Sequence, residues 1–272
     1  MGAVVPLVSP NSTAPHAADG SDPRCIPIKL MGPIPIGDEI EYPRYTDEQH
    51  EVWRTLYARQ EKLLPGRAAD EFLSGLAALD LDRDKIPALR EVSRRLFETT
   101  RWRLARTPGL LDAHDFFSHL ARRIFPCTDY VRAQHELDYT PAPDCFHDIF
   151  GHTPMIIHSR FANFYQELGL AALACQDAVV EEALTRIYWF TVEFGLIRNR
   201  SGLRIYGNGI ISSYGETQHS LTDQVRKEPF TPERVTVQPY DIWHFQNDLF
   251  VIESFDQLQA EFERWAGSHR LL

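Results

Sequence analysis

The chain has 272 residues, of which 43% are hydrophobic and 24% charged, and its formal net charge is −10 at pH 7. This composition is ordinary for a globular protein with room for a sizeable core. The acidic balance and the lack of a basic stripe exclude a typical nucleic-acid-binding protein. No apolar run approaches the roughly 20 residues of a membrane-spanning helix. We therefore expect neither nucleic-acid nor membrane partners.

The N-terminus and the cysteines indicate the compartment. The first residues lack the basic region and long apolar stretch of a secretory signal. The four cysteines, Cys25, Cys127, Cys145 and Cys175, are widely spaced and form no CxxC motif. In a chain of this size they are typical of reduced thiols, so we expect a cytoplasmic protein.

The chain begins with a segment of unusual composition. Residues 1–24 are rich in Pro, Ala, Ser, Asn and Gly and show no periodicity, which predicts a disordered tail. Closely spaced prolines over residues 26–45 predict an extended arm. Residues 25–272 contain no internal repeats and are expected to form one domain.

Most of the remaining chain shows helical periodicity. The predicted helices cover residues 46–64, 69–79, 86–100, 110–125, 159–175, 179–197 and 254–266. Thr46 is the expected N-cap of the first, because acidic residues follow it in the first turn. Short, β-branched segments predict strands at 203–213 and 235–242. The predicted fold class is therefore mostly α with a minor β component.

Two histidine pairs share one spacing. His114 and His119 lie in "HDFFSH", and His147 and His152 lie in "HDIFGH". Side chains five residues apart on a regular helix point about 140° apart, so binding one ion requires a distorted helix or a helix end. Gly151 favours such a break in the second motif. The first motif lies in an unbroken amphipathic pattern, so we expect its histidines to diverge.

A metal site needs a third ligand, and Glu193 is the candidate. It stands among aromatic and aliphatic residues in "YWFTVEFGL", where a carboxylate is costly unless paired, protonated or bound to metal. Two imidazoles and one carboxylate with open positions are typical of non-heme Fe(II) oxygenases, and zinc can bind the same ligands. The alternatives are core or surface histidines with satisfied hydrogen bonds and a helix whose polar stripe includes Glu193.

Three segments together resemble a known family. "PDCFHDIFGHTP", "IYWFTVEFGL" and "YGNGIISSYGE" are similar to the catalytic domain of the pterin-dependent aromatic amino acid hydroxylases, especially the bacterial phenylalanine hydroxylases. The resemblance covers residues 85 to 262 in unbroken order. It implies a single catalytic domain without regulatory or tetramerisation segments, and therefore a monomer.

The resemblance also implies roles for individual residues. His147, His152 and Glu193 would hold Fe(II), with water or O2 at the remaining positions. The amino acid substrate would contact Arg132, Thr140, Pro143, Phe125, Trp189, Asn208, Gly209, Ser212 and Ser213. In this set the Arg132 guanidinium would bind the substrate carboxylate. The pterin and the surroundings of the iron would involve Gly109, Leu110, Leu111, Phe116, Asp148, Tyr188 and Glu216. Phe116 would stack on the pterin ring.

The implied activity is hydroxylation of L-phenylalanine to L-tyrosine by Fe(II), tetrahydrobiopterin or a related tetrahydropterin, and O2. Asn208 stands where the family usually has alanine, which leaves a phenylalanine 3-hydroxylase as an alternative. Trp189 resembles the phenylalanine and tyrosine enzymes more than the tryptophan enzymes, so tryptophan ranks behind phenylalanine. Two alternative functions belong to other classes: a zinc hydrolase that uses the same three ligands, and a binding protein without turnover.

Overall fold

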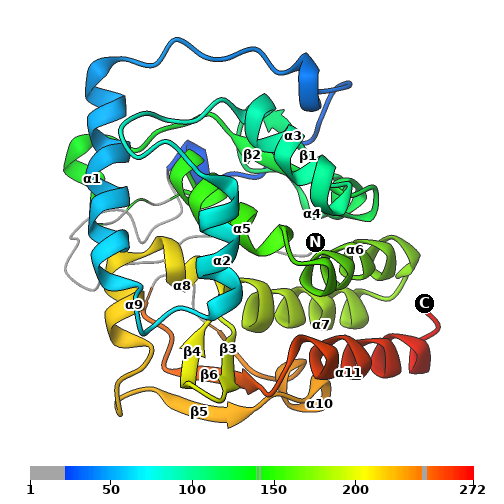
Figure 1. Cartoon of the computed structure of the whole chain (residues 1–272). Helices are drawn as coiled ribbons and strands as arrows, with labels where there is room; N and C mark the ends of the chain where they lie inside the picture. Colours follow the sequence, from blue (N-terminus) through cyan, green and yellow to red (C-terminus); the bar gives the residue numbers. More distant parts are fainter. Residues whose placement is uncertain (1–21, 139, 141, 241–243) are drawn as a thin grey trace.

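Helices make up most of the computed structural model, which describes residues 22–272 except residues 139, 141 and 241–243 (Figure 1). The α-helices are α1 (Asp47–Leu63), α2 (Asp70–Leu79), α3 (Leu89–Thr100), α4 (Ala113–Ala121), α5 (Thr153–Ile156), α6 (Ser159–Ala174), α7 (Ala178–Tyr188), α8 (Asn208–Ser212), α9 (Tyr214–His219), α10 (Pro232–Val235) and α11 (Phe255–Ser268). Short 3₁₀-helices are η1 (Pro23–Cys25), η2 (Gly37–Glu39) and η3 (Gln134–Glu136), and two π-helices are η4 (His147–His152) and η5 (Trp189–Glu193).

Two small sheets complete the fold. The strands β1 (Arg103–Thr107) and β2 (Ile124–Thr128) pair in parallel, with α4 between them in the chain. The second sheet has the order β4-β3-β6-β5, and its strands are β4 (Gly202–Ile205), β3 (Leu196–Asn199), β6 (Asp248–Ile252) and β5 (Arg226–Pro229). The pair β3 and β4 is antiparallel, whereas β6 runs parallel to both β3 and β5. The mostly helical fold class is confirmed.

The predicted helix starts rest on local capping. The Thr46 hydroxyl accepts a hydrogen bond from the Gln49 N–H, and the Gln49 side chain accepts one from the Thr46 N–H. This reciprocal pair satisfies two of the donors that a helix N-terminus leaves open. Helices α1, α2, α3, α6 and α11 all lie within or close to the ranges predicted from periodicity.

Four predicted segments differ from the structure. The helix expected over 110–125 ends at Ala121, and its last residues enter β2 because they pair with β1. The helix expected over 179–197 gives way to η5 and then β3. In the segment 203–213, residues 203–205 belong to β4 and residues 208–212 form α8. No strand forms in the described part of 235–242, where α10 ends in turns.

The structure describes only part of the segment that was predicted to be a disordered tail, residues 1–24. Residues 1–21 of the predicted tail lie outside the described residues. Residues 22–24 do not fit the expected disorder, because Arg24 forms ion pairs with Asp22 and Glu136 at 2.6 and 2.7 Å. The predicted arm that follows is mostly extended, and Ile28 and Ile36 form isolated bridges to Leu111 and Ala105.

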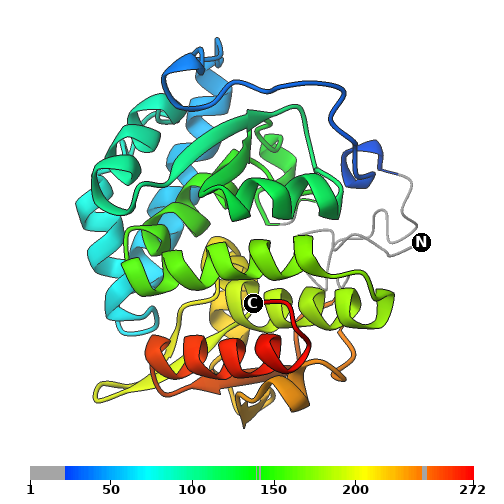
Figure 2. The same cartoon turned by 90° about the vertical axis from the view of Figure 1, so that its right-hand side faces the viewer.

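Close helix packing surrounds the π-helices. Helix α6 lies between α4 on one side and α7 and α11 on the other (Figures 1 and 2). A Cβ at Gly169 of α6 would lie 2.4 Å from the Ala121 nitrogen, and one at Gly75 of α2 would lie 2.0 Å from the Pro154 carbonyl oxygen. These glycines therefore let α6 approach α4, and α2 approach α5, which continues directly from η4.

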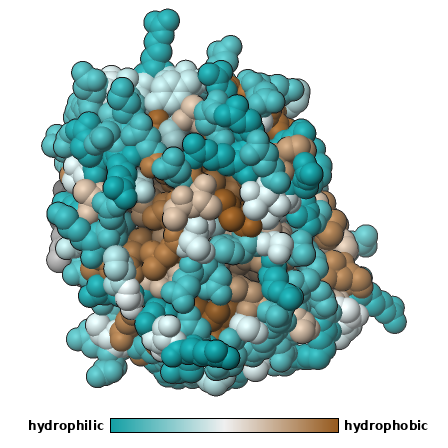
Figure 3. All heavy atoms as spheres, viewed as in Figure 1, coloured by the Kyte–Doolittle hydropathy of each residue, from teal (hydrophilic) through white to brown (hydrophobic). Residues whose placement is uncertain are grey.

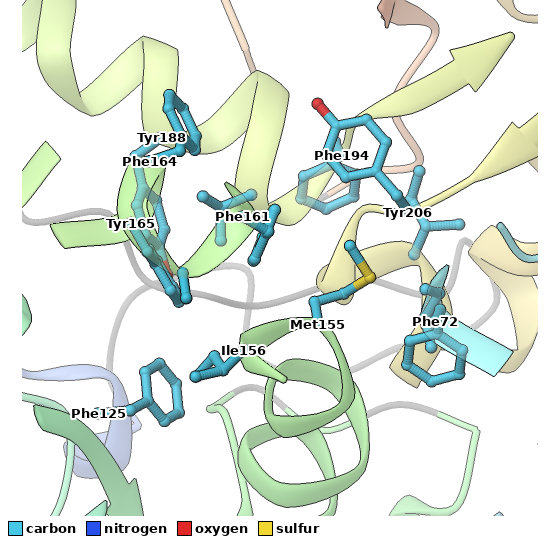
Figure 4. Packing of buried hydrophobic residues seen from close by; sticks show 14 of the residues in the cluster. Phe72, Phe125, Met155, Ile156, Phe161, Phe164, Tyr165, Tyr188, Phe194 and Tyr206 are labelled. Atoms are coloured by element: carbon cyan, nitrogen blue, oxygen red, sulfur yellow. The ribbon is translucent and has the colours of Figure 1, made fainter. Parts of the chain in front are cut away.

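The buried core consists largely of aromatic side chains. Figure 4 shows part of it, with Tyr165 and Tyr188 together on one side of Phe161 and Tyr206 on the other. On the face of Figure 1, hydrophobic atoms gather near the centre and hydrophilic side chains surround them (Figure 3). Among the described residues, no helix combines the length and the apolar character needed to cross a membrane.

Candidate active site

Two π-helices carry the predicted metal ligands. His147 and His152 are the first and last residues of η4, and Glu193 is the last residue of η5. Each backbone hydrogen bond of a π-helix joins residues five apart. In η5, the Phe194 N–H donates to the Trp189 carbonyl at 2.9 Å. Residues five apart therefore share a face, so this spacing brings the two imidazoles of η4 together.

The upstream pair shows the same spacing on a regular helix. His114 and His119 both lie in α4. The His114 side chain is 77% exposed, whereas His119 is buried with Nδ1 2.7 Å from the Asp115 carbonyl oxygen. The two side chains diverge as predicted. The type of helix, and not the spacing, decides which pair converges.

The three predicted ligands lie within reach of one ion. The Nε2 atoms of His147 and His152 are 3.0 Å apart. Glu193 places Oε1 3.3 Å from Nε2 of His152 and Oε2 3.8 Å from Nε2 of His147. Two donors bound at right angles about 2.1 Å from one metal lie about 3.0 Å apart. The separations fit a single metal ion with further positions left for other ligands.

Hydrogen bonds at the opposite ring nitrogens orient both imidazoles. Nδ1 of His147 lies 2.8 Å from Oγ of Ser212. Nδ1 of His152 lies 2.9 Å from the Tyr165 hydroxyl and 3.0 Å from the Asn208 amide nitrogen. Such contacts fix the ring orientation of metal-binding histidines. They leave both Nε2 atoms free to face the ion.

Burial sets the protonation of the free ligands. It lowers the pKa of His147 to about 4 and that of His152 well below its ordinary value, so both imidazoles are neutral, as metal binding requires. Burial raises the pKa of Glu193 to about 8, although hydrogen bonds from Tyr188 and the Gly209 backbone oppose this rise. A bound cation would supply the positive charge that this carboxylate lacks among its neighbours.

Asp148 is a second carboxylate close to both histidines. One ligand atom from each of His147, Asp148 and His152 can be chosen so that all lie within 4.8 Å of one another. However, Oδ2 of Asp148 accepts a hydrogen bond from the Thr128 N–H at 2.7 Å. Glu193 faces the Nε2 atoms of both histidines, so we favour Glu193 over Asp148 as the third ligand.

Arg132 is buried and paired. Its Nε and Nη2 donate to the two carboxylate oxygens of Asp144 at 2.7 and 2.8 Å, and both residues are at most 6% exposed. Burial alone would lower the pKa of Arg132, but the attraction of Asp144 raises it instead. The His147 N–H also donates to Asp144 at 3.1 Å. Asp144 therefore links the arginine directly to the start of η4.

A pocket connects Arg132 with His147, one of the predicted metal ligands. It holds about 480 Å³ of space between atoms, counting space that is open to solvent. The hydrogen bonds from Arg132 to Asp144 use Nε and Nη2 and not Nη1. The predicted substrate and metal residues that line this pocket are Arg132, Thr140, Pro143, His147, Ser212 and Ser213. The structure thus brings together the predicted carboxylate clamp and one of the predicted metal ligands.

Four other residues predicted to contact the substrate do not line this pocket. Phe125 stacks on the His152 ring, with centroids 4.6 Å apart. The Trp189 indole N–H donates to Gln246 at 3.2 Å. Asn208 lies against His152, and the Gly209 backbone N–H interacts with Glu193. A Cβ at Gly209 would lie 3.0 Å from Oε2 of Glu193, so a glycine gives this carboxylate room.

Phe116, which is predicted to stack on the pterin, lies near the predicted metal ligands. Phe116 contacts Tyr188 and Phe125 edge-to-face, with ring centroids 5.6 and 6.4 Å apart. Tyr188 in turn donates a hydrogen bond to Oε1 of Glu193 at 2.8 Å. Phe116 is therefore one aromatic contact away from the third ligand.

The backbone of residues 109–111 already carries internal contacts. The Gly109 carbonyl accepts from the Thr107 hydroxyl at 3.1 Å, and the Leu110 carbonyl accepts from the Ile28 N–H at 2.8 Å. Leu111 forms an isolated bridge with Ile28. The N-terminal arm thus runs beside the stretch expected to contact the pterin.

Glu216 makes no contact with the three predicted metal ligands. It is fully buried, and Oε1 accepts a hydrogen bond from the Gln246 N–H at 3.0 Å. Burial raises the pKa of Glu216 to about 8. Since no contact of Glu216 reaches His147, His152 or Glu193, its role near the iron remains a prediction.

Sequence reasoning missed two residues that contact the ligands. Asp144 holds Arg132 and the His147 backbone, and its position three residues before His147 is a detectable signal for a helix N-terminus. Tyr165 reaches Nδ1 of His152 from α6. A tyrosine within an amphipathic helix gives no such signal, because it reads as an ordinary core residue.

Comparisons with known proteins agree with this geometry. Residues 33–270 match the family described as biopterin-dependent aromatic amino acid hydroxylase. The chain belongs to this family. A phenylalanine-4-hydroxylase of Ralstonia nicotianae is 45% identical over 216 residues, which are 79% of this chain and 69% of the relative. A tyrosine 3-monooxygenase of Rattus norvegicus is 39% identical over 235 residues, which are 85% of this chain and 47% of that protein.

A solved hydroxylase structure is also similar. Phenylalanine hydroxylase from Chromobacterium violaceum, with bound iron(III) and oxidized 7,8-dihydrobiopterin, matches with a TM-score of 0.80 and 42% identity over 83% of both chains. The predictions of the family, of a pterin-dependent hydroxylase and of a single catalytic domain are confirmed. The predicted cofactors, iron and a pterin, are those that this structure of a relative contains.

Proposed function

We propose that this hydroxylase converts L-phenylalanine to L-tyrosine, using Fe(II) held by His147, His152 and Glu193, a tetrahydropterin and O2. The observation that carries the proposal is the pocket lined by both Arg132 and His147. This pocket joins a buried guanidinium to one of the predicted metal ligands. A substrate with a carboxylate at one end and a ring at the other suits this arrangement.

The choice of phenylalanine rests on the pocket and on the relatives. Leu56, Leu137 and Pro143 contribute apolar lining, which suits an unsubstituted ring. Three bacterial relatives of 44–45% identity are named phenylalanine-4-hydroxylase. A tyrosine 3-monooxygenase is less similar, at 39% identity. These observations favour phenylalanine over tyrosine and favour the para product.

Each side chain of the site has a separate role in the proposed reaction. Bound Fe(II) and the tetrahydropterin together supply the chemistry that activates O2. Arg132 binds the substrate carboxylate through Nη1, while Asp144 holds the opposite edge of the guanidinium. Ser212 orients His147, and Tyr188 orients Glu193. Phe116 provides an aromatic surface for the pterin.

Product analysis tests this proposal. The protein, loaded with Fe(II), is incubated with L-phenylalanine, tetrahydrobiopterin and air, and the products are separated against para-, meta- and ortho-tyrosine. We expect para-tyrosine, absent when Fe(II), the pterin or O2 is omitted. Meta-tyrosine would overturn the assigned ring position. Formation of 5-hydroxytryptophan from tryptophan, with no tyrosine from phenylalanine, would overturn the substrate.

The zinc hydrolase and binding-protein alternatives are separated by the same assay. Turnover that requires Fe(II) and is lost with Zn(II) contradicts the hydrolase. Any catalytic turnover contradicts a protein that only binds. We also infer that residues 25–272 act as a monomeric catalytic unit in the cytoplasm, which size-exclusion chromatography of the full chain tests for the oligomeric state.

A further inference from the structure

Tyr165 and Asn208 both contact the nitrogen of His152 that faces away from the metal position. We propose that these two residues hold His152 in the orientation and tautomer that bind the metal, and thereby raise the metal affinity of the site. Both act through His152 and are therefore positioning residues. The inference rests on the proposed metal site of His147, His152 and Glu193.

The geometry places two polar groups on one ring nitrogen. Nδ1 of His152 lies 2.9 Å from the Tyr165 hydroxyl and 3.0 Å from Nδ2 of Asn208. All three residues are fully buried. A hydrogen bond in such an environment is not exchanged for water, so its loss leaves an unsatisfied polar group. His147 differs, because its Nδ1 contacts only the single hydroxyl of Ser212 among the described residues.

The hydroxyls of Tyr165 and Tyr188 connect His152 with Glu193. The two oxygens lie 3.2 Å apart, and the Tyr188 hydroxyl donates to Oε1 of Glu193 at 2.8 Å. Figure 4 shows these two tyrosines side by side. The chain of contacts therefore runs from one metal ligand to another through two buried phenols.

Metal binding fixes the direction of the hydrogen bonds between His152 and Glu193. A His152 that binds metal through Nε2 carries its proton on Nδ1, which must donate. The Tyr165 oxygen then accepts from Nδ1, and its own proton goes to the Tyr188 oxygen. Tyr188 donates to the Glu193 carboxylate, which only accepts when ionised. One arrangement of protons thus satisfies the contacts among His152, the two tyrosines and Glu193, and it matches the metal-binding state of both ligands.

When His152 carries its proton on Nδ1, Asn208 can accept a hydrogen bond from that proton only if its amide group is turned. As placed, Nδ2 faces His152, and the buried Oδ1 has no hydrogen-bond partner among the described residues. A half turn of the amide places Oδ1 at the same distance from Nδ1, where it shares the single Nδ1 proton with the Tyr165 oxygen, and moves Nδ2 to the position that Oδ1 now occupies. The amide oxygen and nitrogen occupy equivalent positions, so this turn requires no movement of the backbone.

Metal titration of Tyr165→Phe, Asn208→Ala and the double variant tests the proposal. The probes are Fe(II) and Co(II) alone, measured against a competing chelator. We expect each single variant to bind either metal about 10-fold more weakly and the double variant about 100-fold more weakly. The visible spectrum of bound Co(II) should also shift, because the ligand ring is no longer fixed. A residue with only a packing role would not change this spectrum.

Tyr206→Phe is the matched control. Tyr206 is also fully buried, and its hydroxyl has no hydrogen-bond partner among the described residues. This control should retain wild-type affinity and spectrum. Wild-type affinity and an unchanged Co(II) spectrum in the Tyr165 and Asn208 variants would overturn the inference. If the wild-type protein itself bound neither metal, the proposed function would fail first, so the two failures are distinguishable.

Discussion

Glu193→Ala is expected to lose Fe(II) and hydroxylation together. Its carboxylate oxygens lie 3.3 and 3.8 Å from Nε2 of His152 and His147, so alanine removes one of the three proposed protein ligands. Changes to residues that merely hold a ligand cost about 10–100-fold in metal affinity, so loss of a ligand should cost more than about 100-fold. Iron content after dialysis and single-turnover product formation measure the two losses.

Asp148→Asn is the control for that experiment. An asparagine oxygen can still accept the hydrogen bond that Asp148 receives from the Thr128 N–H. This variant should therefore keep its fold and its iron. The opposite result, iron lost in Asp148→Asn and retained in Glu193→Ala, would make Asp148 the third ligand. Thermal unfolding of the metal-free variants separates ligand loss from unfolding.

Arg132→Ala is expected to weaken both substrate binding and the fold. A hydrogen bond to a charged group contributes about 1.5–3 kcal/mol, which corresponds to about a 10- to 150-fold rise in KM for phenylalanine. The same change leaves Asp144, which is 0% exposed, without its cation. Breaking a buried ion pair from one side costs about 3–5 kcal/mol. Steady-state kinetics and denaturant unfolding measure the two effects.

A double variant separates the two roles of Arg132. Arg132→Ala combined with Asp144→Asn removes the unpaired charge but keeps an acceptor for the His147 N–H. We expect it to recover stability but not substrate affinity. 2-Phenylethylamine, which lacks the carboxylate, should bind wild type and double variant equally. A wild-type KM for phenylalanine in the double variant would remove Arg132 from the carboxylate role.

The sequence predicted most helices because their apolar faces repeat at helical spacing. It missed the strands β1 and β2, because Ile124 and Phe125 continue the apolar pattern of α4 and only pairing with β1 separates them from it. Pro126 lies inside β2, so proline here marks no simple end of structure. Tertiary pairing, which a local pattern does not contain, decided these boundaries.

The sequence named the candidate metal ligands, but it indicated only part of their geometry. The spacing of His147 and His152 required a distortion, and Gly151 suggested a helix break. The structure instead uses a continuous π-helix, in which Gly151 permits close packing. A Cβ there would lie 3.1 Å from the Asn208 carbonyl oxygen. π-Helices are rare and have no simple sequence pattern, yet they often occur at functional sites.

The surroundings of the ligands were harder to predict because they come from distant segments. Asn208 was expected at the substrate ring on the basis of family position, whereas its side chain contacts His152. Tyr165 lies 13 positions beyond His152 on another helix, and only the packing of α6 against the site brings them together. Such contacts depend on the assembled core and not on local spacing.

Locating the iron tests the proposed metal site most directly. A crystal of the protein loaded with Fe(II) without air, measured at the iron absorption edge, gives the metal position from anomalous scattering. We predict one peak within bonding distance of Nε2 of His147, Nε2 of His152 and the Glu193 carboxylate. A peak bound by Asp148 without Glu193, or no peak between the two histidines, would contradict it.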